Sequence, residues 1–192
     1  MARSDYVYRI VTLLVAIAAG AAAWAEVAEI KSHYREDIRR RKRVATHEFA
    51  GDMLHGQFMV NHVEGMTAIW VHYAAEGSPH EDMLTHSTYA SLSAEIEADT
   101  AEQPDHGRDA VAKMDAHLDA ILNTFESMVM EIDGGILDED ICYAYWAPVF
   151  PAWERWARGY IDERRKDRPH IWEDFERTAT AWRERTETLR RR

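Results

Sequence analysis

The sequence predicts an all-α protein, with a single N-terminal transmembrane helix followed by a cytoplasmic helical bundle. Three observations support this prediction. The N-terminus contains an uncharged apolar run, apolar residues then recur every three or four positions, and the 192 residues include only 5 prolines and 9 glycines. We divide the chain into four segments: a transmembrane anchor over 1–25, a basic juxtamembrane segment and long helix over 26–75, an acidic helix with linkers over 76–107, and a helical hairpin plus C-terminal helix over 108–192.

The predicted anchor is long enough to cross a bilayer. Residues 6–25 form a helix of about 30 Å, which matches the hydrocarbon core. Seven basic residues between positions 31 and 43 follow the run, against Arg3 and Arg9 before it. Positive charge stays on the cytoplasmic side, so we expect a single-pass inner-membrane protein with its N-terminus outside and its C-terminal domain in the cytoplasm. The alternative is a cleaved signal peptide ending near Ala25, which the dense basic cluster disfavours.

The anchor and the basic run that follows it contain the first candidate binding residues. Ala16 with Gly20, and Ala19 with Ala23, have the spacing that lets a second membrane helix approach closely. The basic run is expected to contact anionic lipid headgroups, at about 1 kcal/mol for each cationic side chain. It comprises Arg39, Arg40, Arg41, Lys42 and Arg43.

Histidines on the long helix suggest a second kind of site. On an ideal helix, the set His47, His55, His62 and His72 falls within an arc of about 100°. Asp52 precedes His55 by three positions, as in half of a dinuclear metal site. Metal or haem ligation is therefore an alternative hypothesis. The simpler interpretation is a semi-buried face of hydrogen-bonded histidines, and no cofactor is predicted.

The middle of the chain is acidic. Gly77, Ser78 and Pro79 end the long helix, a shorter helix is expected over 81–100, and a turn over 103–107. Between residues 76 and 119 we count eleven acidic residues against two basic ones. This is a solvated face or a docking surface for a basic partner. The formal net charge of −11 argues against a nucleic-acid partner.

A helical hairpin is predicted after residue 110. Its first helix has a seven-residue apolar repeat. Gly134 and Gly135 are expected to end this helix, and Asp138 is expected to cap the next one. Pro148 and Pro151 are expected to break or kink that second helix. The repeat comprises Val111, Met114, Leu118, Ile121, Phe125, Met128 and Ile132, widened by Leu122 and Val129.

The second helix continues an apolar face, and a last helix follows it. A loop over 167–169 separates the two, and we expect the last helix to pack back on the hairpin. Cys142 is expected to be a small core residue. The face of the second helix comprises Ile141, Tyr145, Val149, Trp153, Trp156 and Tyr160, and that of the last helix comprises Trp172, Phe175, Ala179, Trp182, Thr186 and Leu189.

Four short segments form a set in the second half of the chain. They are Leu-Asn-Thr-Phe-Glu over 122–126, Gly-Ile-Leu-Asp-Glu-Asp over 135–140, Trp-Glu at 153–154 and Trp-Glu-Asp-Phe-Glu over 172–176. Together they resemble one bacterial and phage family of membrane-anchored helical proteins, which is defined as a domain of unknown function. The resemblance implies a helical fold and no established activity. Asn123 and Glu126 fall on the outer face of the repeat, as partner contacts or as solvated surface.

No catalytic motif emerges, because the sequence has neither a phosphate-binding glycine loop nor a Gly-x-Ser-x-Gly segment. We therefore expect a non-enzymatic, membrane-anchored protein-interaction protein, an accessory or structural subunit of a membrane complex. Its expected partners are the lipid bilayer and other membrane proteins, in a larger complex or a homo-oligomer. The alternative is a metal- or haem-binding helical protein that uses the histidines of the 47–72 helix.

Overall fold

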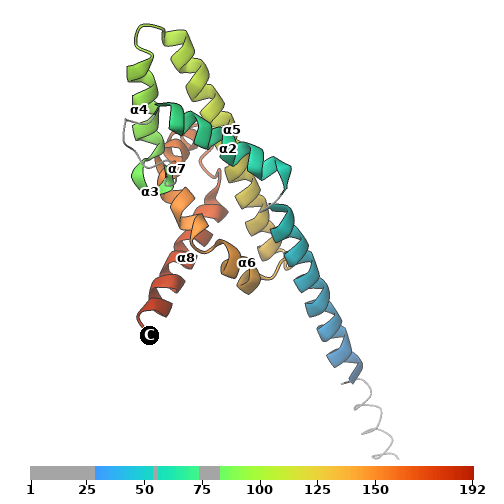
Figure 1. Ribbon diagram of the computed structural model, residues 1–192. Helices are drawn as coiled ribbons and strands as arrows, with labels where there is room; N and C mark the ends of the chain where they lie inside the picture. Colours follow the sequence, from blue (N-terminus) through green and yellow to red (C-terminus); the bar gives the residue numbers. More distant parts are fainter. Residues whose placement is uncertain (1–28, 54–55, 74–82) are drawn as a thin grey trace, which may run out of the picture. The chain divides into compact units, whose positions relative to one another are not determined.

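The computed structural model describes residues 29–53, 56–73 and 83–192 (Figure 1). All regular secondary structure in these ranges is helical, so the predicted all-α bundle is confirmed. The chain divides into two compact units, Met1–Lys42 and Arg43–Arg192. In the first unit, residues 29–42 are helical, and the second unit contains all the helices labelled in Figure 1.

The long helix expected over 26–75 is interrupted, so that prediction is wrong. Residues 43–53 are helical, Gly56 is not, and helix α2, Gln57–Tyr73, starts directly after Gly56. Glycine weakens a helix because it has no side chain and loses the most backbone freedom on folding. α2 packs on the central helix α5 through the buried side chains of Met59, Met66 and Trp70.

The acidic region forms two helices where one was predicted. Helix α3, Met83–His86, is followed by α4, Tyr89–Asp99. Thr88 begins α4 with reciprocal hydrogen bonds, because its amide donates to Ser91 Oγ at 2.9 Å and its hydroxyl accepts from the Ser91 amide. These capping bonds start a new helix at Tyr89, so the helix does not continue through Thr88. The turn predicted over 103–107 is mostly helical, since α5 starts at Pro104, where a proline fits the first turn.

Helix α5, Pro104–Asp133, is the central element of the second unit and contacts α2, α4 and α8 (Figure 1). The predicted repeat is confirmed, because its members are buried except for the half-buried Val111 and Ile132. The helix ends as expected at the glycine pair. Gly135 has a φ of +74°, and the amides of Ile136 and Leu137 both donate to the carbonyl oxygen of Glu131.

The two glycines Gly135 and Gly51 provide a matched pair of substitutions. Gly135→Ala is expected to lower the free energy of unfolding by about 1 kcal/mol, because a Cβ disfavours positive φ. Gly51 is helical with no atom within 4 Å of a built Cβ, so Gly51→Ala should raise it by about 0.5 kcal/mol. Urea denaturation of both variants measures the difference, and equal shifts would refute the role of Gly135.

Helix α6, Glu139–Trp146, begins at the predicted cap. The Asp138 carboxylate accepts from the amides of Asp140 and Ile141, at 3.1 and 3.3 Å. The predicted break occurs at Pro148, and helix α7 runs over Val149–Arg165. Pro151 lies in the first turn of α7 and breaks nothing. Helix α6 buries Cys142 and Trp146, whereas Tyr145 is 44 % exposed and does not belong to the buried face, contrary to the prediction.

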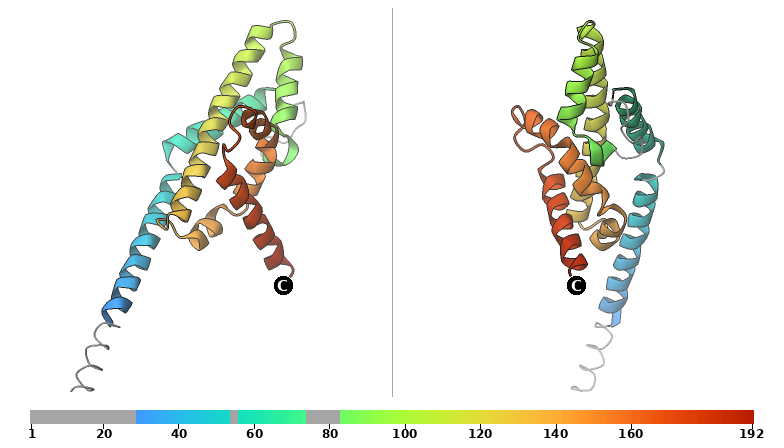
Figure 2. Two further views of the ribbon diagram at one scale, coloured as in Figure 1. Left: turned by 180° about the vertical axis from the view of Figure 1, so that it is seen from behind. Right: turned by 60° about the vertical axis from the view of Figure 1, so that its left-hand side comes forward.

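Helix α8, Glu173–Arg190, closes the core. It lies against α5 and α7, as Figure 2 shows and as the sequence predicted. Phe175, Ala179 and Trp182 are buried, whereas Leu189 at the end of the predicted face is 53 % exposed. Trp172 precedes the helix with a left-handed φ of 54°, although it was expected inside the helix.

Candidate functional site

The histidines of the alternative metal-binding hypothesis do not converge in the described part of the chain. His47 lies edge-on to Tyr145, with ring centroids 6.2 Å apart, and His72 lies against Tyr73. Asp52 is exposed, and His55 falls outside the described residues. Among the residues described, no group of three or more His, Cys, Asp or Glu side chains is placed to hold a metal ion.

His62 makes a different contact, which the sequence did not reveal. Its Nδ1 lies 3.0 Å from Nδ1 of His117 on α5, and the ring of Phe58 covers it edge-on. Gly65 allows this approach, since a Cβ there would lie 2.4 Å from the His117 ring. Burial, followed by the neighbouring His62, lowers the pKa of His117. The pair therefore joins α2 to α5 while His117 is neutral.

Stability is expected to depend on pH through His117. Its folded-state pKa lies below the unfolded value of about 6.5, so the unfolded chain binds more protons near that pH. The contribution of His117 to the free energy of unfolding is therefore fully present above a pH of about 6.5, and it is lost as the pH falls through the lower folded pKa. His117→Gln should make the free energy of unfolding less dependent on pH between about 7.5 and 5.5. His106→Gln, an exposed position on the same helix, is the control, and equal slopes in both variants would contradict the assignment.

Asn123 and Glu126, the predicted partner contacts, bind groups within the chain. The Asn123 amide oxygen accepts from Trp172 Nε1 at 2.9 Å, and the Glu126 carboxylate accepts from the Phe175 amide at 2.7 Å. Glu126 thus receives an otherwise unpaired donor at the start of α8. Burial raises the pKa of Glu126, partly offset by that hydrogen bond. Both side chains position α8, and a contact to another protein through them stays a prediction.

A polar cluster joins α4, α5 and α7. Tyr89 donates to Asp115 at 2.9 Å, and Tyr160 donates to Asp119 at 2.6 Å. Arg164 donates to both the Tyr160 hydroxyl and Asp119. Burial, and then the hydrogen bonds to the aspartates, raise the pKa of both phenols, so they remain protonated donors. This arrangement links three helices through hydrogen bonds donated by two phenols and one guanidinium.

The membrane-related predictions fall at the start of the chain. The anchor over 1–25, including Ala16, Ala19, Gly20 and Ala23, lies outside the described residues. In the ranges that the structure describes, no helix has the length and apolar character needed to span a membrane. In the helical residues 29–42, the apolar side chains Ile30, Tyr34 and Ile38 are 67, 67 and 47 % exposed.

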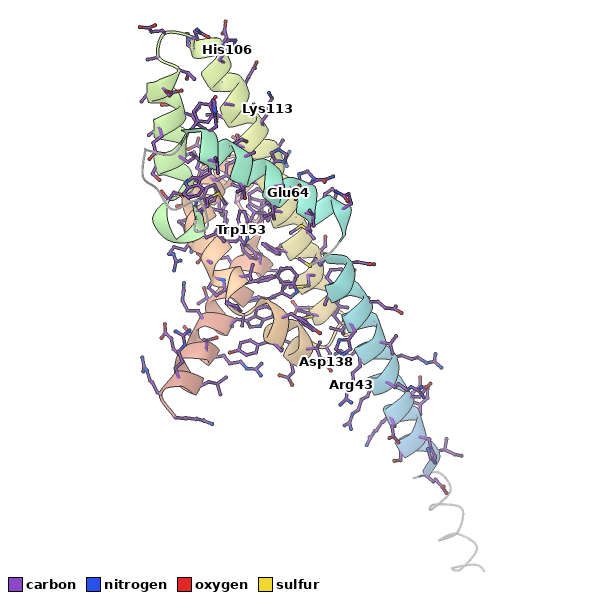
Figure 3. The ribbon with its side chains drawn as sticks, in the orientation of Figure 1. Arg43, Glu64, His106, Lys113, Asp138 and Trp153 are labelled. Carbon is purple, nitrogen blue, oxygen red and sulfur yellow. The ribbon has the colours of Figure 1, made fainter. Side chains whose placement is uncertain are left out.

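An apolar pocket in the second unit is a concave site that the sequence did not predict. Its volume is about 290 Å³, and residues from the helix before Gly56, α2, α5, α6 and α7 line it. In Figure 3, Glu64 of α2 and Trp153 of α7 mark its position. The lining residues are Met53, Met59, Val60, Val63, Glu64, Phe125, Trp146, Val149 and Trp153.

Comparison with protein families identifies the chain. Residues 13–182 match the family described as a domain of unknown function, DUF4760. Because the match covers most of the chain, the protein belongs to this family. The expectation of a family of unknown function is confirmed, whereas the membrane anchor and the short segments that suggested the family stay predictions. Comparisons with curated proteins and with solved structures found no match.

Proposed function

We propose that this member of the DUF4760 family is a membrane-anchored, non-catalytic helical protein that binds other membrane proteins as an accessory or structural subunit. The observation that supports it most is the exposed apolar row on residues 29–42. Ile30, Tyr34 and Ile38 are spaced by four, so they share one helical face. Apolar rows of this kind are usually covered by a partner.

The register of the row relates it to the predicted anchor. On an ideal helix of 3.6 residues per turn, Ile30, Tyr34 and Ile38 share an arc of about 100° with the four small residues of the anchor. A partner helix that packs against Ala16, Ala19, Gly20 and Ala23 would therefore meet the same face beyond the bilayer. This continuity favours a helical membrane protein, in a larger complex or a homo-oligomer, as the partner.

The basic residues 39–43 fit the same proposal. All except the half-buried Lys42 are exposed. On the cytoplasmic side they would contact anionic headgroups, at about 1 kcal/mol for each cationic side chain. The expected topology is one span in the inner membrane, with the N-terminus outside and the C-terminal bundle in the cytoplasm.

Gentle detergent extraction from native membranes, followed by native size analysis and mass spectrometry, tests the proposal. The full-length chain should migrate in a defined complex. Ala23→Ile should remove the partner, whereas Ala21→Ile, the same change at about 160° from Ala23 around an ideal helix, should not. Ile30→Ser combined with Ile38→Ser should weaken the complex more than Leu189→Ser, a change at another exposed apolar side chain. A wild-type chain that migrates alone would reject the proposal.

A further inference from the structure

Three segments that are far apart in the sequence meet at one end of the second unit. The Asp138 amide donates to Thr46 Oγ1 at 2.7 Å, which links the turn after α5 to the first helix of the unit. Arg185 donates to Asp140 at 2.8 Å, which links the last turns of α8 to the start of α6. Arg43 lies at the same end (Figure 3). We call this the basal end, and it comprises residues 43–46, 130–145 and 185–192.

Exposed apolar side chains concentrate at the basal end. In the part of the second unit that the structure describes, eight large apolar side chains are exposed, and five of them belong to this end. Single apolar side chains are common on soluble surfaces, whereas a group of them usually marks a contact. The five are Val44, Met130, Ile136, Tyr145 and Leu189, which are 44–62 % exposed.

The end of α8 places cations beside these side chains. Residues 183–192 contain five arginines and two glutamates, in a chain whose formal net charge is −11. Within the described ranges, Arg190 and Arg192 form no ion pair. In Figure 2, α8 extends beyond α6, so its last turn lies past the acidic residues that start α6. Four of the five acids in residues 130–145 are bound within the chain, namely Asp133 to Arg177, Asp138 to the first amides of α6, Glu139 to Trp182 and Asp140 to Arg185.

The opposite end of the unit has a different character. His106, at the start of α5, and Asp138, just after its end, mark the two ends in Figure 3. The helix has 30 residues, so it separates them by about 45 Å. Residues 95–109, the α4–α5 tip, contain six acidic residues and one basic residue, and no large apolar side chain of the described residues 89–113 is exposed. An anionic surface therefore repels the tip and attracts the end of α8.

We propose that the basal end rests on the anionic surface of the membrane, with Ile136 and Leu189 in the interfacial layer and the arginines at 190–192 against lipid phosphates. Exposed apolar side chains beside cations suit such an interface, where burial of apolar area adds to attraction by anionic lipids. The inference rests on the proposed function, because the predicted anchor keeps the unit at the bilayer. It adds a second contact to the one expected for residues 39–43 and directs the acidic tip away from the membrane.

A fluorescent label near the end of α8 tests this contact in the full-length chain, reconstituted in lipid vesicles. Thr188→Cys and, at the opposite end, Glu102→Cys each introduce an exposed thiol for a nitrobenzoxadiazole dye. Burial raises the pKa of the native Cys142 thiol to about 11, so this thiol should not react. In vesicles that contain phosphatidylglycerol, lipids with a nitroxide on the headgroup should quench the dye about three times more strongly at position 188 than at position 102. Phosphatidylcholine alone, or high salt, should reduce this difference.

Charge-matched variants identify the groups that make the contact. Replacing the arginines at 190–192 with glutamine should lower the quenching at position 188 at least about twofold. A control removes the same charge from three other exposed positions and should leave the quenching unchanged. Equal losses in the two variants would overturn the proposal. The control combines Lys113→Gln, Arg155→Gln and Arg168→Gln.

The apolar part of the contact and the anchor have separate tests. Ile136→Asp should lower the quenching at position 188 about twofold, whereas Val71→Asp, the same kind of change at an exposed position on α2, should not. Alkaline carbonate extraction of the same vesicles tests the anchor. A chain that carbonate releases would reject the proposed function and this inference with it. An embedded chain with equal quenching at positions 188 and 102 would overturn this inference alone.

Discussion

Replacing Phe125 with alanine is expected to lower the free energy of unfolding by about 4 kcal/mol, the largest effect of any single truncation considered. Phe125 is fully buried on α5 and contacts four other aromatic rings. The centroid distances are 6.0 Å to Trp146, 4.6 Å to Phe150, 6.5 Å to Trp153 and 5.4 Å to Phe175. These rings come from α6, α7 and α8, so the substitution loosens three helices at once.

Urea denaturation monitored by helical circular dichroism measures this loss. Met130→Ala removes a large apolar side chain from the same helix, but Met130 is 62 % exposed, so that variant should change stability by less than about 0.5 kcal/mol. Similar values for the two variants would show that the aromatic cluster is not the centre of the core.

Replacing Arg158 with methionine is expected to lower the free energy of unfolding by about 3 kcal/mol. Glu154 is only 1 % exposed and meets the Arg158 guanidinium one turn further along α7. Arg183 of α8 lies 3.5 Å away and is a weaker second partner. Arg158 also pairs with Glu176 of α8. Without Arg158, the buried acidic side chain of Glu154 loses its main compensation, which costs more than the ion pair itself contributes.

The double variant Glu154→Met with Arg158→Met separates these two contributions. Removing both charges should restore most of the lost stability, because no buried group is left uncompensated. Arg155→Met, at an exposed position on the same helix, should have little effect. If the double variant were less stable than Arg158→Met alone, the buried-charge explanation would fail.

Local signals accounted for most of the fold. The repeat of α5, the cap at Asp138 and the positive φ at Gly135 each depend on residues within a few positions of one another. The break before α4 had a local signal too, since Thr88 and Ser91 have capping-box spacing. It was missed because serine replaces the usual acidic partner at the third position.

The candidate sites were harder to predict because they depend on helix packing. The pair of His62 and His117 joins residues that are 55 positions apart, and no periodicity relates them. The same limit applies to Glu154, which is buried only because Arg158 and α8 compensate its charge. Asn123 and Glu126 were predicted on the outer face of the repeat, and their hydrogen bonds to Trp172 and to the start of α8 were not foreseen.

The junction between α5 and the start of α8 has a consequence for biosynthesis. Trp172 and Phe175, which bond Asn123 and Glu126, are made about 50 residues after them. The rings of Phe125 and Phe150 therefore lack their packing partner Phe175 until that residue has been made. Exposed apolar surface of this kind attracts chaperones and promotes aggregation. Trp182 also packs on Phe150, so the core stays open until α8 has been made, and slower synthesis of residues 126–182 should increase aggregation.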